Sequence, residues 1–129
     1  MMPITPVKTL VTEAKEQIES LSQEAAQEQA EAGTAQLVDI RDIRELKRDG
    51  RIPGAIHAPR GMLEFWIDPQ SPYHKPEFAT DKKLVLFCAS AWRSALATKT
   101  LQDMGVENIA EMEGGFSAWK SRGAPIETD

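Results

Sequence analysis

The amino-acid sequence predicts an α/β domain with a mostly parallel sheet, and three observations lead to that class. From residue 36 onward, short apolar runs alternate with segments of helical periodicity. The runs are almost continuously apolar, which is typical of parallel strands covered by helices on both faces. The chain has 129 residues, of which 41% are hydrophobic and 27% charged, and this suits one domain with a genuine core.

The first third of the chain is expected to be helical. Apolar residues recur there at spacings of four and three, with Glu and Gln on the other face: Leu10, Ala14, Ile18 and Leu21. A capping box that begins at Ser20 and a stop at Gly33 divide this part into helices over about 8–18 and 22–31.

The remaining elements follow in order along the chain. Strands are expected at residues 36–40, 55–57, 84–87 and 109–111, and helices at 43–47 and from Arg93 to Gly105. Residues 59–82 interrupt this alternation with four Pro and four aromatic residues. Their front half, 61–67, is expected to be helical, and the prolines after it prevent a regular element. The aromatic side chains favour a packed cover over a site.

Composition and charge exclude several classes of function. The net charge is −5, of which −4 falls on residues 1–33, so the chain has no basic stripe of the kind that binds nucleic acid. The longest apolar run, 84–89, is far shorter than the roughly 20 residues of a membrane-spanning helix. The N-terminus also lacks a secretory signal, and we expect a cytoplasmic protein with no membrane partner. A single cysteine excludes an internal disulfide and a multi-cysteine zinc site.

That cysteine, Cys88, lies just beyond the strand-like residues 83–87, and the next helix begins at Arg93. In an open parallel sheet, ligands bind beyond the carboxyl ends of the strands, where loops enter helix N-termini. Backbone N–H groups of such a loop and the helix dipole favour an anion, so we expect a Cys88 pKa below that of a free thiol. The alternative is an inert cysteine at the rim of the core. Small residues at 89–91 and the charge of Arg93 favour the reactive interpretation.

The spacing between Cys88 and Arg93 separates two kinds of anion-binding loop. Phosphatases of the cysteine class use five intervening residues to encircle a tetrahedral phosphate, whereas four intervene here. The tighter ring suits a single sulfur atom, and this favours persulfide chemistry over phosphate ester hydrolysis. The two histidines, His57 and His74, lie in stretches that do not obviously face the loop, which disfavours a Cys–His hydrolase.

Four segments, in the same order and at similar distances, resemble motifs of the rhodanese family of sulfurtransferases. They are residues 37–41 with Glu45, 50–57, 88–94 and 114–125, and the likeness covers about residues 20–127. Arg51 stands where histidine is common in the second motif. The resemblance implies a five-stranded, mostly parallel sheet with helices on both faces. We therefore expect a rhodanese-like domain over 20–129, preceded by an N-terminal helical extension over 1–19.

The resemblance also implies a reaction and a set of site residues. Cys88 is implied to take sulfane sulfur from a donor such as thiosulfate, 3-mercaptopyruvate or another persulfide, and to pass it to a thiol or cyanide-like acceptor. The persulfide is implied to lie among the N–H groups of the loop residues Ala89, Ser90, Ala91, Trp92 and Arg93. Arg93 and Ser94 are implied to stabilise the loop and the helix start. No metal and no organic cofactor is implied.

Three loop positions bear on substrate and strain. Ala91 stands where many members have glycine, and a positive φ there costs alanine roughly 1 kcal/mol or more, so we expect a loop that is either slightly reshaped or strained. Ala89 stands where thiosulfate-using members often have a basic residue, which weakens the case for a doubly charged donor. Trp92 either packs down over the loop or stands beside the sulfur, where it favours an apolar acceptor.

Two residues outside the loop are candidates for supporting roles. Asp39 ends the first strand of the alternating part, and it either orients an arginine of the site or caps the helix at 42–47. Arg60 either reaches the site together with Glu64 or forms an ordinary surface ion pair with it. Structural roles are expected for Gly114, Gly115, Phe116 and Trp119, while Tyr73 and His74 are candidates for closing the entrance.

Two hypotheses compete with a sulfurtransferase. The acidic N-terminal helices are either simply solvated or bind a partner protein. In the second case the domain is a regulatory or non-enzymatic sulfur carrier. A phosphatase or an arsenate reductase is the other hypothesis, and the short loop disfavours it.

Overall fold

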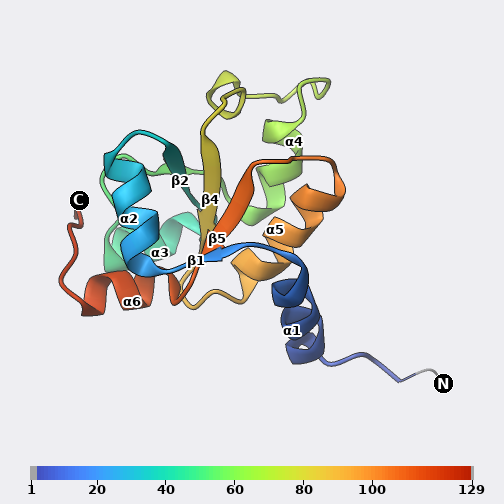
Figure 1. Ribbon diagram of the computed structural model, residues 1–129, viewed down its shortest axis with the longest axis horizontal. Coiled ribbons are helices and arrows are strands. Elements are labelled where there is room, and N and C mark those ends of the chain that lie inside the picture. The colour runs from blue at the N-terminus through green and yellow to red at the C-terminus, as the bar shows by residue number, and fades with distance from the viewer. Residues whose placement is uncertain (1–2, 129) are drawn as a thin grey trace.

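The computed structural model describes residues 3–128 and contains a five-stranded sheet in the order β1-β5-β4-β2-β3. All neighbouring strands in this sheet are parallel. The strands are β1 (Ser20–Leu21), β2 (Ala35–Asp39), β3 (Ile56–His57), β4 (Lys83–Phe87) and β5 (Ile109–Met112). Helices cover both faces of the sheet (Figure 1), so the predicted α/β class is confirmed.

The helices form two layers around this sheet. They are α1 (Val7–Gln17), α2 (Gln23–Glu31), α3 (Ile43–Asp49), α4 (Leu63–Ile67), α5 (Arg93–Asp103) and α6 (Gly115–Ser121), with short 3-10 turns η1 (Arg60–Met62) and η2 (Pro76–Phe78). Figure 1 shows α2, α3 and α6 on one side of the sheet, α4 and α5 on the other, and α1 beside α5. Within residues 3–128, no helix is long and apolar enough to span a membrane.

Successive side chains of a strand point to opposite faces of the sheet, so each strand contributes side chains to two apolar layers, one on each face. Leu86 packs in the layer that contains Leu101 of α5. Its neighbour Val85 packs in the layer that contains Trp119 of α6. Cys88 follows the same alternation and lies in the layer on the α5 side. The apolar run of β4 thus places the cysteine over the start of the helix that follows it.

The N-terminal helix buries a different stripe from the predicted one. Val11 and Ala14 are buried against Ala95 of α5, with Ile18 beside them, whereas Leu10 is 44% exposed. Residues 11, 14 and 18 lie at positions i, i+3 and i+7 of one helical face. This stripe shares Ala14 and Ile18 with the apolar spacing of the sequence and leaves Leu10 at its edge.

A short strand replaces the predicted capping box before the second helix. Ser20 lies in β1, where the backbone N–H of Glu111 in β5 donates to the carbonyl of Glu19. Ser22 caps α2 instead, and its side chain accepts a hydrogen bond from the Ala25 N–H at 3.1 Å. A strand of two residues is too short to produce a sequence pattern. Its place at the edge of the sheet is set by pairing with β5.

The segment over 59–82 is only partly packed. The predicted helix forms in its front half as η1 and α4. Pro76 begins η2 where no regular element was expected, since proline fits the first turn of a helix. Phe78 is buried, but Phe65 and Tyr73 are 51% and 61% exposed. The predicted packed cover is therefore wrong for these two rings.

Candidate active site

Cys88 follows β4, whose neighbours in the sheet are β5 and β2, and so it lies at the carboxyl ends of the strands. The loop after it leads into α5 at Arg93. Two backbone hydrogen bonds fasten this loop to α6. The Phe116 N–H donates to the Cys88 carbonyl at 2.8 Å, and the Ser117 N–H donates to the Ala89 carbonyl at 3.0 Å. Three elements thus hold the cysteine backbone.

This attachment to α6 depends on the glycine pair at its start. Gly114 and Gly115 have φ angles of 73° and 60°, which L side chains rarely adopt. A Cβ on Gly115 would lie 2.7 Å from the Ala89 carbonyl oxygen and closer still to that of Cys88. The pair forms the turn that the sequence predicts. In addition, glycine at 115 allows α6 to approach the cysteine loop.

The Cys88 sulfur is fully buried and surrounded by hydrogen-bond donors. The Ser94 N–H donates to Sγ at 3.4 Å, and the Ser94 hydroxyl oxygen lies 3.6 Å from Sγ. The N–H groups of Ser90 and Ala91 also hydrogen-bond to the sulfur. Burial by itself raises the pKa of the Cys88 thiol. The hydrogen bonds from Ser94, Ser90 and Ala91 outweigh burial, and the pKa lies below its ordinary value.

Ala91 provides the bend that closes this loop. Its φ is 70°, and no other non-glycine residue within 3–128 has a positive φ. This conformation costs an L residue about 1–2 kcal/mol. In return, the successive N–H groups of Ser90 and Ala91 both reach the sulfur, as in other anion-binding backbone concavities. Of the two alternatives for this position, the positive φ of Ala91 agrees with the strained loop.

Arg93 is held in place by a carboxylate that we did not predict as part of the site. Its guanidinium donates to Glu45 of α3 through Nη1 at 2.8 Å and Nη2 at 3.0 Å. The Arg93 hydrogen bond lowers the pKa of Glu45, and that of Arg93 is raised, mainly by Glu45 and further by Cys88. Glu45 also accepts from the Asp42 N–H in the capping box of α3. That box is a sequence signal, but it does not indicate the arginine.

Asp39 forms a buried ion pair at the end of β2. Its carboxylate accepts from Arg41 Nη2 at 2.7 Å, and both side chains are 1% exposed. Arg41 also donates to the Gly50 carbonyl at 2.9 Å and lies 4.0 Å above the Phe116 ring centre. The arginine that Asp39 orients is therefore Arg41. The alternative that Asp39 caps the next helix is wrong, because Asp42 caps α3.

The other predicted residues lie nearer the surface. Arg60 donates to Glu64 at 2.6 Å in an i, i+4 pair of partly exposed side chains, which is the surface ion pair of the two alternatives. Trp92 is 46% exposed, so it does not pack down over the loop. His57 Nε2 lies 2.7 Å from the Arg41 carbonyl oxygen and has a structural contact. Within residues 3–128, no group of three or more His, Cys, Asp or Glu side chains is placed to hold a metal ion.

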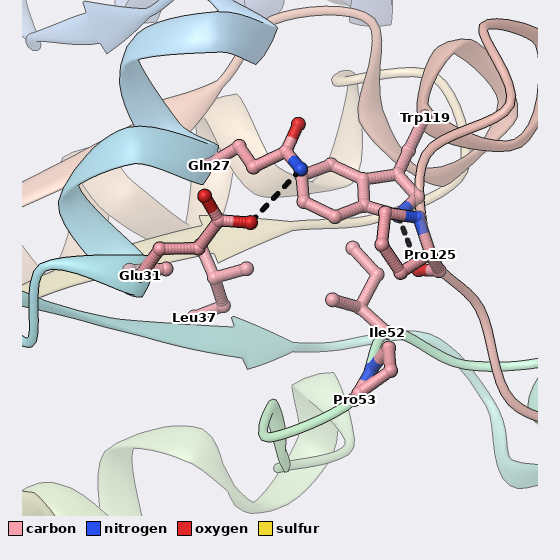
Figure 2. Close-up of a pocket in the computed structure, with 8 residues that line it drawn as sticks. Gln27, Glu31, Leu37, Ile52, Pro53, Trp119 and Pro125 are labelled. Atoms are coloured by element: carbon pink, nitrogen blue, oxygen red, sulfur yellow. Dashed lines mark hydrogen bonds between the residues drawn. The ribbon is translucent and has the colours of Figure 1, made fainter.

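Two hollows lie on the face of the sheet that α6 covers. One, of about 420 Å³, borders the cysteine loop and is lined by Arg41, Asp49, Ala89, Phe116, Ser117, Lys120 and Ser121. The other, of about 310 Å³, is shown in Figure 2, where Gln27 and Glu31 lie opposite Ile52 and the Trp119 indole. None of the residues lining the second hollow belongs to the cysteine loop. We assign the hollow beside Ala89 to the candidate site.

Comparison with known proteins agrees with this arrangement. The family described as Rhodanese-like domain matches residues 22–122. A protein named sulfurtransferase from Allochromatium vinosum is 30% identical over 105 residues, which cover 81% of this chain and 90% of that protein. An uncharacterized Bacillus subtilis protein is 35% identical over 85 residues, and the match covers 66% of this chain. The match spans only 60% of that protein's length.

Two solved structures have the same fold. A protein of unknown function from Rhodopseudomonas palustris, called a possible tyrosine phosphatase, is 52% identical with a TM-score of 0.90, and the match covers 98% of this chain and 100% of that one. The polysulfide-sulfur transferase homodimer from Wolinella succinogenes is 33% identical with a TM-score of 0.71, and the match covers 95% of this chain and 87% of that one.

Proposed function

Since the chain belongs to the rhodanese-like domain family, which includes sulfurtransferases, we propose that it transfers sulfane sulfur through a persulfide on Cys88. The observation that carries this proposal is the ring of donors around Sγ, formed by the N–H groups of Ser90, Ala91 and Ser94. These donors lower the pKa of a thiol that burial alone would keep protonated. A thiolate is the form that attacks sulfur.

The proposed reaction has two displacement steps and no net change in oxidation state. In the first, the Cys88 thiolate attacks the outer sulfur of the donor. The donor's S–S bond breaks, and its electron pair leaves with the remaining fragment, such as sulfite or a shortened polysulfide. In the second, a thiolate or cyanide attacks the terminal sulfur of the Cys88 persulfide. The S–S bond to Cys88 breaks, and Cys88 leaves as the thiolate, ready for another cycle.

The protein stabilises negative charge on sulfur both when Cys88 is a thiolate and when it carries a persulfide. Backbone N–H groups are fixed by the loop, so they need no rearrangement when the charge moves to the outer sulfur. The start of α5 adds the partial positive charge of a helix N-terminus. Arg93 lies at the same helix start, and its bidentate bond to Glu45 limits the positions it adopts. These groups stabilise the thiolate and the persulfide anion alike.

The charge around the loop favours a singly charged persulfide as the donor over doubly charged thiosulfate. Ala89 brings no charge next to the cysteine, and the charge of Arg93 is balanced by Glu45. A doubly charged donor therefore meets less positive charge than in a loop with a basic residue at 89. Polysulfide is also doubly charged, and what supports it as a donor is the 33% identity with the polysulfide-sulfur transferase of Wolinella succinogenes.

Steady-state transfer to cyanide tests the proposal. The protein is incubated with polysulfide or thiosulfate, thiocyanate is measured, and Cys88→Ser is compared under the same conditions. We expect transfer from polysulfide with a higher kcat/KM than from thiosulfate, and no transfer by Cys88→Ser. Far-UV circular dichroism checks that the variant is folded. A Cys88→Ser protein that transfers sulfur as fast as the natural chain would refute the proposal.

A phosphatase is the second candidate, and it is favoured by the description of the Rhodopseudomonas palustris protein as a possible tyrosine phosphatase. Against it stands the loop itself, in which four residues separate Cys88 from Arg93 and the donors converge on the sulfur. Hydrolysis of p-nitrophenyl phosphate distinguishes the two. Turnover that Cys88→Ser abolishes, together with no sulfur transfer, would establish the phosphatase in place of the sulfurtransferase.

A further inference from the structure

Glu111 is a fully buried carboxylate in β5 among otherwise apolar strand residues. Buried carboxylates are rare unless they are paired, because burial removes their hydration. Three donors from three elements surround this one. Glu111 Oε1 accepts from the Ser94 hydroxyl of α5 at 2.8 Å, and Oε2 accepts from the Ser20 hydroxyl of β1 and from Lys15 Nζ of α1, each at 3.0 Å.

The Ser94 hydroxyl connects this carboxylate with the cysteine. Its oxygen lies 2.8 Å from Glu111 Oε1 and 3.6 Å from Cys88 Sγ, and the residue is fully buried. A serine hydroxyl has one proton to donate and two lone pairs to accept with. When Cys88 is a thiol, the S–H donates to Ser94 and the hydroxyl donates to Glu111. When Cys88 is a thiolate, the sulfur and the carboxylate compete for the same hydroxyl proton.

Lys15 affects the competition between the sulfur and the Glu111 carboxylate for the Ser94 hydroxyl proton. Its ammonium group bonds to the Glu111 carboxylate, and it comes from α1, which precedes the residues that match the family. With the Lys15 charge and the Ser20 hydroxyl in place, Glu111 keeps two donors when the Ser94 hydroxyl turns to the sulfur. Without Lys15, a buried and uncompensated negative charge would hold the hydroxyl proton and oppose a second negative charge on Cys88.

Other charged groups also surround the loop, and among them Arg93 interacts directly with Cys88 while Glu45 balances its charge. They are Arg93 with Glu45 of α3, Asp39 with Arg41 after β2, His57 of β3 and Lys120 of α6. Glu111 is joined to Sγ through a single hydroxyl group. We propose that Glu111 and Lys15 are positioning residues that direct the Ser94 hydroxyl and thereby set the ionisation of Cys88. This inference rests on the proposed function, because it concerns the Cys88 thiolate that would carry sulfur.

Titration of Cys88 in the natural chain and in four variants tests this role. The apparent pKa comes from the pH dependence of iodoacetamide alkylation, which is specific because the chain has a single cysteine. We expect Lys15→Met to raise the Cys88 pKa by about one unit and Glu111→Gln to lower it by a similar amount. In the Glu111→Gln background, Lys15→Met should have no further effect. Lys15→Arg should restore the value of the natural chain.

A matched control on the same helix is Lys8→Met, since Lys8 is exposed and should leave the titration unchanged. A shift by Lys15→Met of equal size with and without the carboxylate would overturn the proposal, because it would show a packing effect of α1. An unchanged Cys88 pKa in the folded Glu111→Gln protein would overturn it as well, even if Lys15→Met failed to fold.

This test is separate from that of the proposed function. Alkylation needs no sulfur donor, so a protein that fails to transfer sulfur still reports how Glu111 and Lys15 act on Cys88. Conversely, active sulfur transfer with an unaltered titration in Glu111→Gln would reject the positioning role alone.

Discussion

Replacing Gly115 by alanine tests how the cysteine loop is held. The added Cβ would lie 2.7 Å from the Ala89 carbonyl oxygen, and that oxygen has to retreat by about 0.7 Å to reach an ordinary contact of 3.4 Å. The φ of 60° adds about 1–2 kcal/mol for an L residue, and overpacking adds about 1–3 kcal/mol. Loss of glycine's freedom in the unfolded chain returns about 0.5–1 kcal/mol. We expect a net loss of about 2–4 kcal/mol in the free energy of unfolding.

The same change displaces the cysteine that would carry sulfur. A misplacement of about 1 Å can lower a rate by about 100-fold, so we expect Gly115→Ala to transfer sulfur 10- to 100-fold more slowly. Urea unfolding measures the stability, and thiocyanate formation measures the transfer.

Gly123→Ala is the control that isolates the backbone cost. Gly123 has a φ of 76°, but a Cβ there has no neighbour within 4 Å. We expect this variant to lose only about 1 kcal/mol and to keep full transfer activity. If Gly115→Ala matches Gly123→Ala within about 0.5 kcal/mol and transfers sulfur at the natural rate, the contact between α6 and the loop does not have the role given to it here.

Three further predictions concern the loop and its supports. Ala91→Gly should stabilise the protein by up to about 1 kcal/mol in urea unfolding, because relief of the φ of 70° slightly exceeds the entropic cost of glycine; a clear loss of stability would contradict this. Asp39→Asn should cost about 3 kcal/mol, because it leaves the buried Arg41 without its charged partner; an unchanged thermal midpoint would count against it. Glu45→Gln should destabilise at neutral pH, with the difference from the natural chain shrinking on acidification. The Arg93 hydrogen bond lowers the pKa of Glu45 in the folded state, so its contribution is present above the ordinary pKa of a glutamate and is lost as the pH falls through the lower folded value. A difference that stayed constant from about pH 6 to pH 3 would be inconsistent with that sign.

Much of the fold follows from local patterns. The apolar run at 84–87 predicts β4, and its end predicts that Cys88 lies at the edge of the sheet where α5 begins. The replacement of a common glycine by Ala91 predicts a positive φ. The first two depend on neighbours in sequence, so a single sequence contains the information, whereas the third comes from the resemblance to a family.

The supports of the site depend on contacts between distant segments. Glu45 lies in a capping box that explains the start of α3, and nothing in that motif indicates that Arg93 is its partner. Glu111 is a single charge in an apolar run, which marks it as unusual without naming Lys15 or Ser94 as its donors. These pairings arise only when the sheet has brought the segments together.

The mass of the protein after exposure to a sulfur donor tests the central claim most directly. The chain is treated with polysulfide, freed of small molecules and measured intact, and the Cys88 peptide is then located by fragmentation. We predict one added sulfur atom, about 32 Da, on Cys88, removed by cyanide and missing in Cys88→Ser. A natural chain that gains no sulfur on Cys88, or that gains it equally after Cys88→Ser, would contradict the sulfur-carrier account.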